Sequence, residues 1–305
     1  MESILASIIE EARPLLAQGR PADYIPALAE AVPSLLGVAI TETGGRVIAS
    51  GDVHVRFTIQ SISKVLTLAY ALEQVGEAEV FSRVGKEPTG DPFNSIIRLE
   101  TSALRKPFNP MINAGAIAVV GLLPGSSPDE RFEGLRAFIA QVVGRPDVGI
   151  DERVYESERA TAARNRAIGW VLKEMRLIEP PVEDVIDVYF RQCSIALDAV
   201  ELSRIGAFLA FDGRSPLDGR PLVSARTARI VKSLMMTCGL YTGSGAFGID
   251  AGIPAKSGVG GGIVAAVRNR MGIGVFSPAL DPNGNSVGGV EALVRLSARL
   301  DLGVL

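Results

Sequence analysis

The spacing of hydrophobic and polar positions divides the chain into three parts. Near the N-terminus, apolar residues recur every three or four positions from Ile4 to Leu16, which predicts an amphipathic helix. An apolar run at residues 35–40, a turn containing Gly44 and Gly45, and an extended segment at 46–50 then follow. This order is typical of a β-hairpin.

The middle of the chain has mostly helical periodicity. A strand expected at residues 53–59 leads into a helix expected at 61–75, which Gly76 ends. Further helices are predicted near residues 113–123, 129–143, 157–176, 182–193, 198–211 and 223–237.

After about residue 250 the pattern returns to strands, at 253–258, 263–268 and 272–276, and ends with a helix at 289–300. Strands therefore lie at both ends of the chain and helices between them. This order predicts an α+β fold, in which both chain ends build one antiparallel sheet flanked by helices. The expected domains are a discontinuous sheet domain (1–76 and 250–305) and a mainly helical lobe (77–249). A cleft between them is the expected place for a site.

Composition and charge exclude several classes of function. The formal net charge is −3, so the chain lacks the basic surface expected for binding nucleic acid or an anionic membrane. Its longest apolar run, residues 111–123, is too short to span a membrane, and the N-terminus has no basic leader. We therefore expect a cytoplasmic protein. With Cys193, Cys238 and the single His54, we expect no metal and no other cofactor.

Three glycine-containing motifs resemble known functional motifs without meeting their requirements. Residues 243–248 match G-x-G-x-x-G but follow a helical segment, so a flexible loop is expected there instead of a dinucleotide site. Residues 284–288 match G-x-S-x-G, but no histidine follows; Asn285 or Ser286 is expected to cap the last helix. Residues 258–262 lack the lysine of a phosphate loop, although a close approach to a ligand or a neighbouring strand stays open.

One pair of motifs does predict catalysis. Ser61 and Lys64 are spaced i, i+3 at the start of a helix, so their side chains share one face. A lysine whose pKa is lowered by burial can serve as the base for a serine nucleophile. Lys256-Ser257-Gly258 lies on a late predicted strand. S-x-x-K with K-[ST]-G is typical of serine β-lactamases and penicillin-binding proteins, although the S-D-N and Y-x-N elements are absent here.

Over nearly its whole length the chain resembles the bacterial serine-dependent glutaminases, which share the β-lactamase/transpeptidase-like fold. Only residue 288, a glycine in place of an expected basic residue, departs from the pattern. The matching segments are residues 22–28 (ADYIPAL), 57–64 (FTIQSISK), 109–117 (NPMINAGAI), 157–159 with 164–165, 189–194 (YFRQCS), 238–241 (CGLY), 252–262 (GIPAKSGVGGG) and 284–286 (GNS).

The resemblance implies an amidohydrolase that converts L-glutamine into L-glutamate and ammonia, acting as a homotetramer or homodimer. Ser61 would be the nucleophile and Lys64 its base, and the N–H groups of Ser61 and Val259 would form the oxyanion hole. Tyr241 would relay a proton or assist Lys64, and Lys256 would give electrostatic support. The residues implied to contact the substrate are Tyr24, Ser61, Asn113, Glu158, Asn165, Tyr189, Tyr241 and Val259.

The chemistry of these side chains fits glutamine. Glu158 can pair with the ammonium group, and Asn and Tyr side chains can hold the carboxylate. Glu158 and Asn165 are seven residues apart, so one helix would present them on the same face. Two alternatives stay open: a penicillin-recognising hydrolase, and an amino-acid-binding protein without catalysis. Cys193 and Cys238 are expected to be buried apolar residues, and His54 to lie near a turn.

Overall fold

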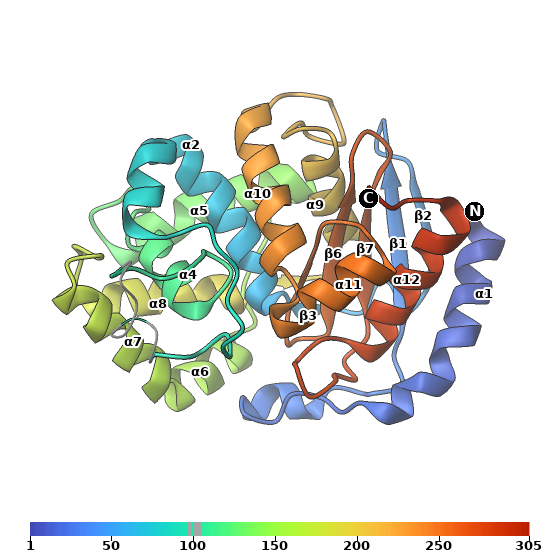
Figure 1. Ribbon diagram of the computed structural model, residues 1–305, viewed down its shortest axis with the longest axis horizontal. Helices are drawn as coiled ribbons and strands as arrows, with labels where there is room; N and C mark the ends of the chain where they lie inside the picture. Colours follow the sequence, from blue (N-terminus) through green and yellow to red (C-terminus); the bar gives the residue numbers. More distant parts are fainter. Residues whose placement is uncertain (97–98, 100–104, 305) are drawn as a thin grey trace.

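A five-stranded antiparallel sheet built from both ends of the chain organises the molecule (Figure 1). The computed structural model describes residues 1–96, 99 and 105–304. The strand order is β2-β1-β7-β6-β5, with antiparallel neighbours throughout. The strands are β1 (Gly37–Glu42), β2 (Val47–Gly51), β5 (Ala255–Ser257), β6 (Gly262–Val267) and β7 (Met271–Phe276). The predicted hairpin, the three late strands and the α+β class are confirmed.

The two faces of the sheet are covered by different helices. On one face, Ile273 and Val275 of β7 pack with residues of α1 (Glu2–Ala12) and α12 (Val287–Leu300). Two alternate positions of β7, Gly272 and Gly274, face α9 (Ala199–Ala210). A Cβ atom at Gly272 would lie only 1.8 Å from a backbone nitrogen of α9. The missing side chains therefore allow α9 to lie directly on the sheet.

Two short 3₁₀ turns, η1 (Arg13–Gln18) and η2 (Pro26–Glu30), link α1 to β1.

A second group of helices lies to one side of the sheet, around α2 (Figure 1). The helices of this group are α2 (Ser63–Arg83), α4 (Asn113–Val120), α5 (Pro128–Val143), α6 (Glu152–Thr161), α7 (Ala163–Glu174) and α8 (Val182–Cys193), and α10 (Ala225–Cys238) packs on α2. The division into two domains stays a proposal. Helix α9 packs on the sheet, although it belongs to the 77–249 segment. No helix in the described part of the chain is long and apolar enough to cross a membrane.

The predicted helix end at Gly76 is confirmed, because Gly76 has non-helical geometry (φ +84°, ψ 162°) and separates two helices within α2, the second of which continues to Arg83. Three other local predictions are wrong. The strand expected at 53–59 is only β3 (Phe57–Thr58), which leaves the main sheet to pair with β4 (Ala196–Leu197). The helix expected at 157–176 is broken at Ala162 into α6 and α7. The loop expected at 243–248 is mostly helix, following the 3₁₀ turn η4 (Tyr241–Gly243) as α11 (Ser244–Asp250).

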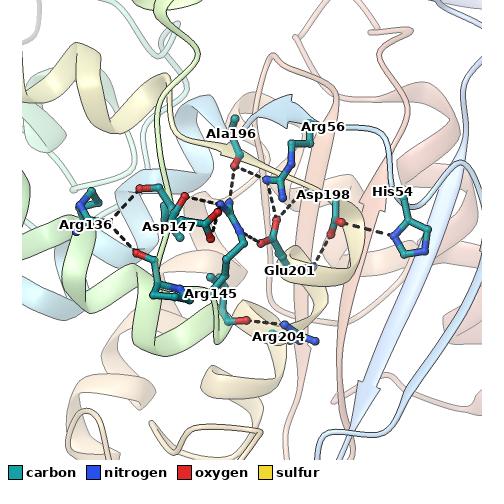
Figure 2. A network of polar contacts seen from close by, with 12 residues as sticks. His54, Arg56, Arg136, Arg145, Asp147, Ala196, Asp198, Glu201 and Arg204 are labelled. Atoms are coloured by element: carbon teal, nitrogen blue, oxygen red, sulfur yellow. Dashed lines mark hydrogen bonds and ion pairs between the residues drawn. The ribbon is translucent and has the colours of Figure 1, made fainter.

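A charge network around the buried Glu201 fixes β3 and β4 against the first turn of α9 (Figure 2). The carboxylate of Glu201, 5% exposed, accepts hydrogen bonds from the guanidinium groups of Arg145 and Arg56. Both arginines also donate to the carbonyl of Ala196, at 3.0 and 3.1 Å. Asp198 and Glu201 form a capping box at the start of α9. The exposed His54 contacts the edge of this network at Asp198, with 3.6 Å between Nδ1 and Oδ2.

We expect Glu201→Ala to lower the free energy of unfolding by about 3 kcal/mol, because it removes charged hydrogen bonds and leaves two guanidinium groups without their buried partner. Urea denaturation measures the change. The matched control is Glu30→Ala, which breaks an ion pair with Arg153 in which both side chains are exposed. That loss should stay below about 1 kcal/mol. Equal losses in the two variants would contradict the importance of the network.

Candidate active site

The turn η3 (Gln60–Ile62), between β3 and α2, carries Ser61. Its entry is fixed by a backbone hydrogen bond from Ile59 to Ile195, and Gln60 has φ +48°. A positive φ is unfavourable for a residue with a long side chain, and strained residues of this kind often occur at functional sites. Lys64 follows in the first turn of α2, so the predicted i, i+3 arrangement of Ser61 and Lys64 is present.

The glycine-rich turn after β5 lies against the segment that leads to Ser61. A Cβ atom at Gly258 would lie 2.5 Å from the carbonyl oxygen of Ile59, and one at Gly260 would lie 2.2 Å from that of Thr58. Both positions therefore require glycine. The close approach, which the sequence left open, is to neighbouring backbone. It brings Val259 into the same pocket wall as Ser61.

A pocket of about 580 Å³, including its open mouth, lies over Ser61. The structure brings seven of the nine predicted site residues together in its lining: Tyr24, Ser61, Asn113, Glu158, Asn165, Tyr189 and Val259. The other two contact lining residues: Lys64 is hydrogen-bonded to Asn113, and Tyr241 is hydrogen-bonded to Ser61. Tyr24 is the most exposed of the set, at 53%.

Several lining residues were not predicted as site residues: Ile25, Gln60, Phe93, Asn94, Thr161, Ala162, Arg164 and Cys193. Gln60 has a local signal, its place directly before the S-x-x-K motif. Cys193 is 2% exposed, which confirms the prediction of burial, yet it also lines the pocket. Burial raises the pKa of its thiol, which disfavours the thiolate needed for a nucleophile.

Lys64 is held by two acceptors in a nearly dry environment. Its side chain is 2% exposed, and Nζ donates to Asn113 Oδ1 at 2.7 Å and to the Met111 carbonyl at 3.3 Å. Burial lowers the pKa of Lys64 to about 8. The amine can therefore lose its proton near neutral pH, as a base for Ser61 requires. Asn113 in turn donates to Asn165 at 3.0 Å, which links Lys64 to the pocket wall.

Tyr241, in η4, contacts Ser61 from a distant part of the sequence. Its side chain is hydrogen-bonded to Ser61, and its hydroxyl donates to the Ser257 carbonyl at 3.4 Å. Burial raises the pKa of Tyr241 to about 12, so the hydroxyl keeps its proton. Its backbone φ is +55°. Lys256 is fully buried, with Nζ 4.2 Å from the centre of the Tyr241 ring and donating to Ser257 O at 2.6 Å.

Glu158 places a buried carboxyl group in the pocket, and no described residue forms an ion pair with it. The carboxyl group is 6% exposed and is hydrogen-bonded to Gln60, while Oε2 has no hydrogen-bond partner among the described residues. Burial raises the pKa of Glu158 to about 8, opposed in part by Lys64 and Gln60. A buried acceptor without a partner is unfavourable unless a ligand satisfies it. The pocket is therefore suited to a ligand with a cationic group at this position.

The prediction that one helix presents Glu158 and Asn165 is wrong, because the helix breaks at Ala162. Both residues nevertheless line the pocket.

The predicted cap of the last helix is confirmed. Ser286 caps α12 and accepts a hydrogen bond from the Gly289 N–H at 3.0 Å. Among the residues that the structure describes, no group of three His, Cys, Asp or Glu side chains is arranged to hold a metal ion.

Comparison with known proteins identifies the family. The glutaminase family model matches residues 19–305. The chain belongs to the glutaminase family. Glutaminase 2 of Clostridium perfringens is 47% identical over 304 residues, with both chains fully covered. The glutaminase of Geobacillus thermodenitrificans is 49% identical over 300 residues, covering 98% of this chain and 97% of its own.

A solved glutaminase has the same fold. It is the Bacillus subtilis glutaminase in a covalent complex with 5-oxo-L-norleucine, formed by reaction with 6-diazo-5-oxo-L-norleucine. It superposes with a TM-score of 0.89 at 36% identity, covering 99% of this chain and 98% of that chain. The family and the glutaminase fold expected from the sequence are thus confirmed.

The unusual pKa of Glu158 is directly measurable. In the ligand-free protein, infrared difference spectra should show a carboxylic acid that becomes a carboxylate with a midpoint of about pH 8, because burial disfavours the charged form. Glu158→Gln should remove this band. Glu156→Gln, at an exposed position on the same helix, should leave it unchanged. A Glu158 band that titrates near pH 4 would contradict the buried, unpartnered state.

Proposed function

We propose that this protein hydrolyses the side-chain amide of L-glutamine to L-glutamate and ammonia through an acyl-enzyme on Ser61. The observation that carries the proposal is the pocket itself: a serine backed by a lysine of lowered pKa faces a buried carboxylate that lacks a cationic partner. The family membership supports it. So does the Bacillus subtilis relative, which forms a covalent complex with a reagent built on an amino acid.

The substrate is held at its α-amino acid end. Its ammonium group pairs with Glu158 and supplies the missing partner of Oε2. Asn165 and Tyr189 bind the α-carboxylate, and Tyr24 covers the mouth of the pocket. The side-chain amide then extends toward Ser61 and the N–H groups of Ser61 and Val259. Binding an ammonium beside Glu158 favours its carboxylate form, so the site gains its full negative charge as the substrate enters.

The reaction proceeds in two steps. Lys64 accepts the Ser61 proton as Oγ bonds to the amide carbon, and the N–H groups of Ser61 and Val259 stabilise the oxyanion. The C–N bond breaks, and the nitrogen leaves as ammonia with a proton delivered through Tyr241 or from Lys64. A water molecule then gives a proton to the base and attacks the ester carbon. The products are L-glutamate and free Ser61, and water is the only co-reactant.

The proposal extends to the setting of the enzyme. We expect a cytoplasmic homodimer or homotetramer, as the family resemblance implies. Both cysteines are buried and unpaired, which is typical of proteins from a reducing compartment. Light scattering of the purified protein distinguishes one, two and four subunits.

The nucleophile is tested with Ser61→Ala. Release of ammonia from glutamine should fall by at least about 10⁴-fold, since no other group can form the acyl-enzyme. Ser82→Ala, at an exposed position of α2, is the control and should keep wild-type activity. Near wild-type turnover by Ser61→Ala would overturn the mechanism. If glutamine stabilised the protein but released no ammonia, an amino-acid-binding protein without catalysis would be favoured. If the protein rapidly hydrolysed a chromogenic β-lactam and did not act on glutamine, a penicillin-recognising hydrolase would be favoured.

The base is tested by the pH profile. For the free enzyme, kcat/KM should rise with pH through about 8 and then level off, because Lys64 becomes neutral and Glu158 becomes charged over the same range. Lys64→Arg keeps a cation at this position at every pH and should be inactive throughout. A profile that is flat between pH 6 and 9, or an active Lys64→Arg variant, would exclude Lys64 as the base.

A further inference from the structure

The turn between β7 and α12 contains a buried asparagine whose role the sequence did not reveal. Asn285 was one of two candidates to cap α12, but Ser286 forms the cap. Asn285 is 2% exposed, and its backbone N–H donates to Asp281 Oδ1 at 2.9 Å within the turn. Its side chain is therefore free to bond outside its own turn.

The amide of Asn285 joins the two segments that bring Tyr241 and Val259 to the pocket. Nδ2 donates to the carbonyl of Leu240, the residue before Tyr241, at 3.2 Å. Oδ1 accepts from Ser257 Oγ at 2.7 Å. Ser257 also provides the carbonyl to which the Tyr241 hydroxyl donates. One side chain thus spans the start of η4 and the end of β5.

This connection matters because the backbone of Tyr241 is unfavourable. A bulky residue at φ +55° is strained and persists only where its surroundings hold it. The turn supplies a further contact to the same segment. Thr242 Oγ1 donates to Asn283 Oδ1 at 3.1 Å.

We propose that Asn285 is a positioning residue that holds the Tyr241 hydroxyl at Ser61. The inference rests on the proposed function of the Ser61 site. Asn285 lies outside the pocket lining formed by the described residues, so it acts through Tyr241 and not on the substrate. Its donor and its acceptor are both used. Aspartate, with the same shape, would place an oxygen against the Leu240 carbonyl where Asn285 places a donor.

The test compares Asn285→Asp with Tyr241→Phe and with the double variant. Asn285→Asp should lower kcat by about 10- to 100-fold, as loss of a supporting hydrogen-bond partner does in other sites, with KM nearly unchanged. The double variant should match Tyr241→Phe alone, because both changes remove the same contribution. A general loss of stability would instead lower kcat independently in the two backgrounds.

Asn269→Asp is the matched control, since it makes the same chemical change at an exposed turn and should leave kcat unchanged. If Asn285→Asp does not fold, Ser257→Ala removes only the hydroxyl that donates to Asn285 and should show the same non-additivity with Tyr241→Phe. Wild-type kcat in either folded variant, or independent losses in the double variant, would overturn the proposal.

A spectroscopic measurement separates this proposal from the proposed function. The ¹³Cζ resonance of Tyr241, assigned by its loss in Tyr241→Phe, should shift in Asn285→Asp while those of the other tyrosines stay in place. If the wild-type protein released no ammonia from glutamine, the proposed function would fail, but the shift would still show whether Asn285 positions Tyr241. An unchanged resonance would exclude the positioning role.

Discussion

The site depends on one backbone contact, between the glycine turn after β5 and the segment that enters η3. The carbonyl groups of Thr58 and Ile59 occupy the space where side chains of residues 260 and 258 would lie. Because those residues are glycines, a turn near the end of the chain can lie beside a serine near its beginning. Val259 and Ser61 line one pocket only under this condition. Any side chain at either glycine would separate the proposed oxyanion donors.

Burial then gives each polar group its proposed role. The same enclosed environment lowers the pKa of Lys64 and raises those of Glu158 and Tyr241, because it disfavours the charged form of every group. The consequences differ with the chemistry of the side chain. The amine of Lys64 becomes available as a base, the carboxyl group of Glu158 ionises when a cation binds beside it, and the phenol of Tyr241 keeps a proton to donate. Burial also raises the pKa of the Cys193 thiol, which disfavours the thiolate and is consistent with Ser61 as the proposed nucleophile.

The sequence predicted what local chemistry determines. Alternation and apolar runs located the sheet strands, and the spacing of Ser61 and Lys64 indicated the proposed nucleophile and its proposed base. Tertiary contacts decided the rest. No glycine or proline marks the break at Ala162, and β3 leaves the main sheet because its partner is β4. Glu158, Asn113 and Tyr189 have no local signal that separates them from core or surface residues, so only the family resemblance pointed to them. Their functional roles stay predictions.

Gln60 and Tyr241, the two residues of the site with positive φ, are held in different ways. Gln60, at φ +48°, is fixed locally: Ser63 Oγ donates to its carbonyl at 2.7 Å. Tyr241 is fixed by distant segments, through Leu240, Asn285 and Ser257. The position of Ser61 therefore depends mainly on the start of α2, whereas the position of Tyr241 depends on the assembly of the sheet with the turn before α12. In the proposed mechanism, correct placement of Tyr241 is thus the more demanding condition.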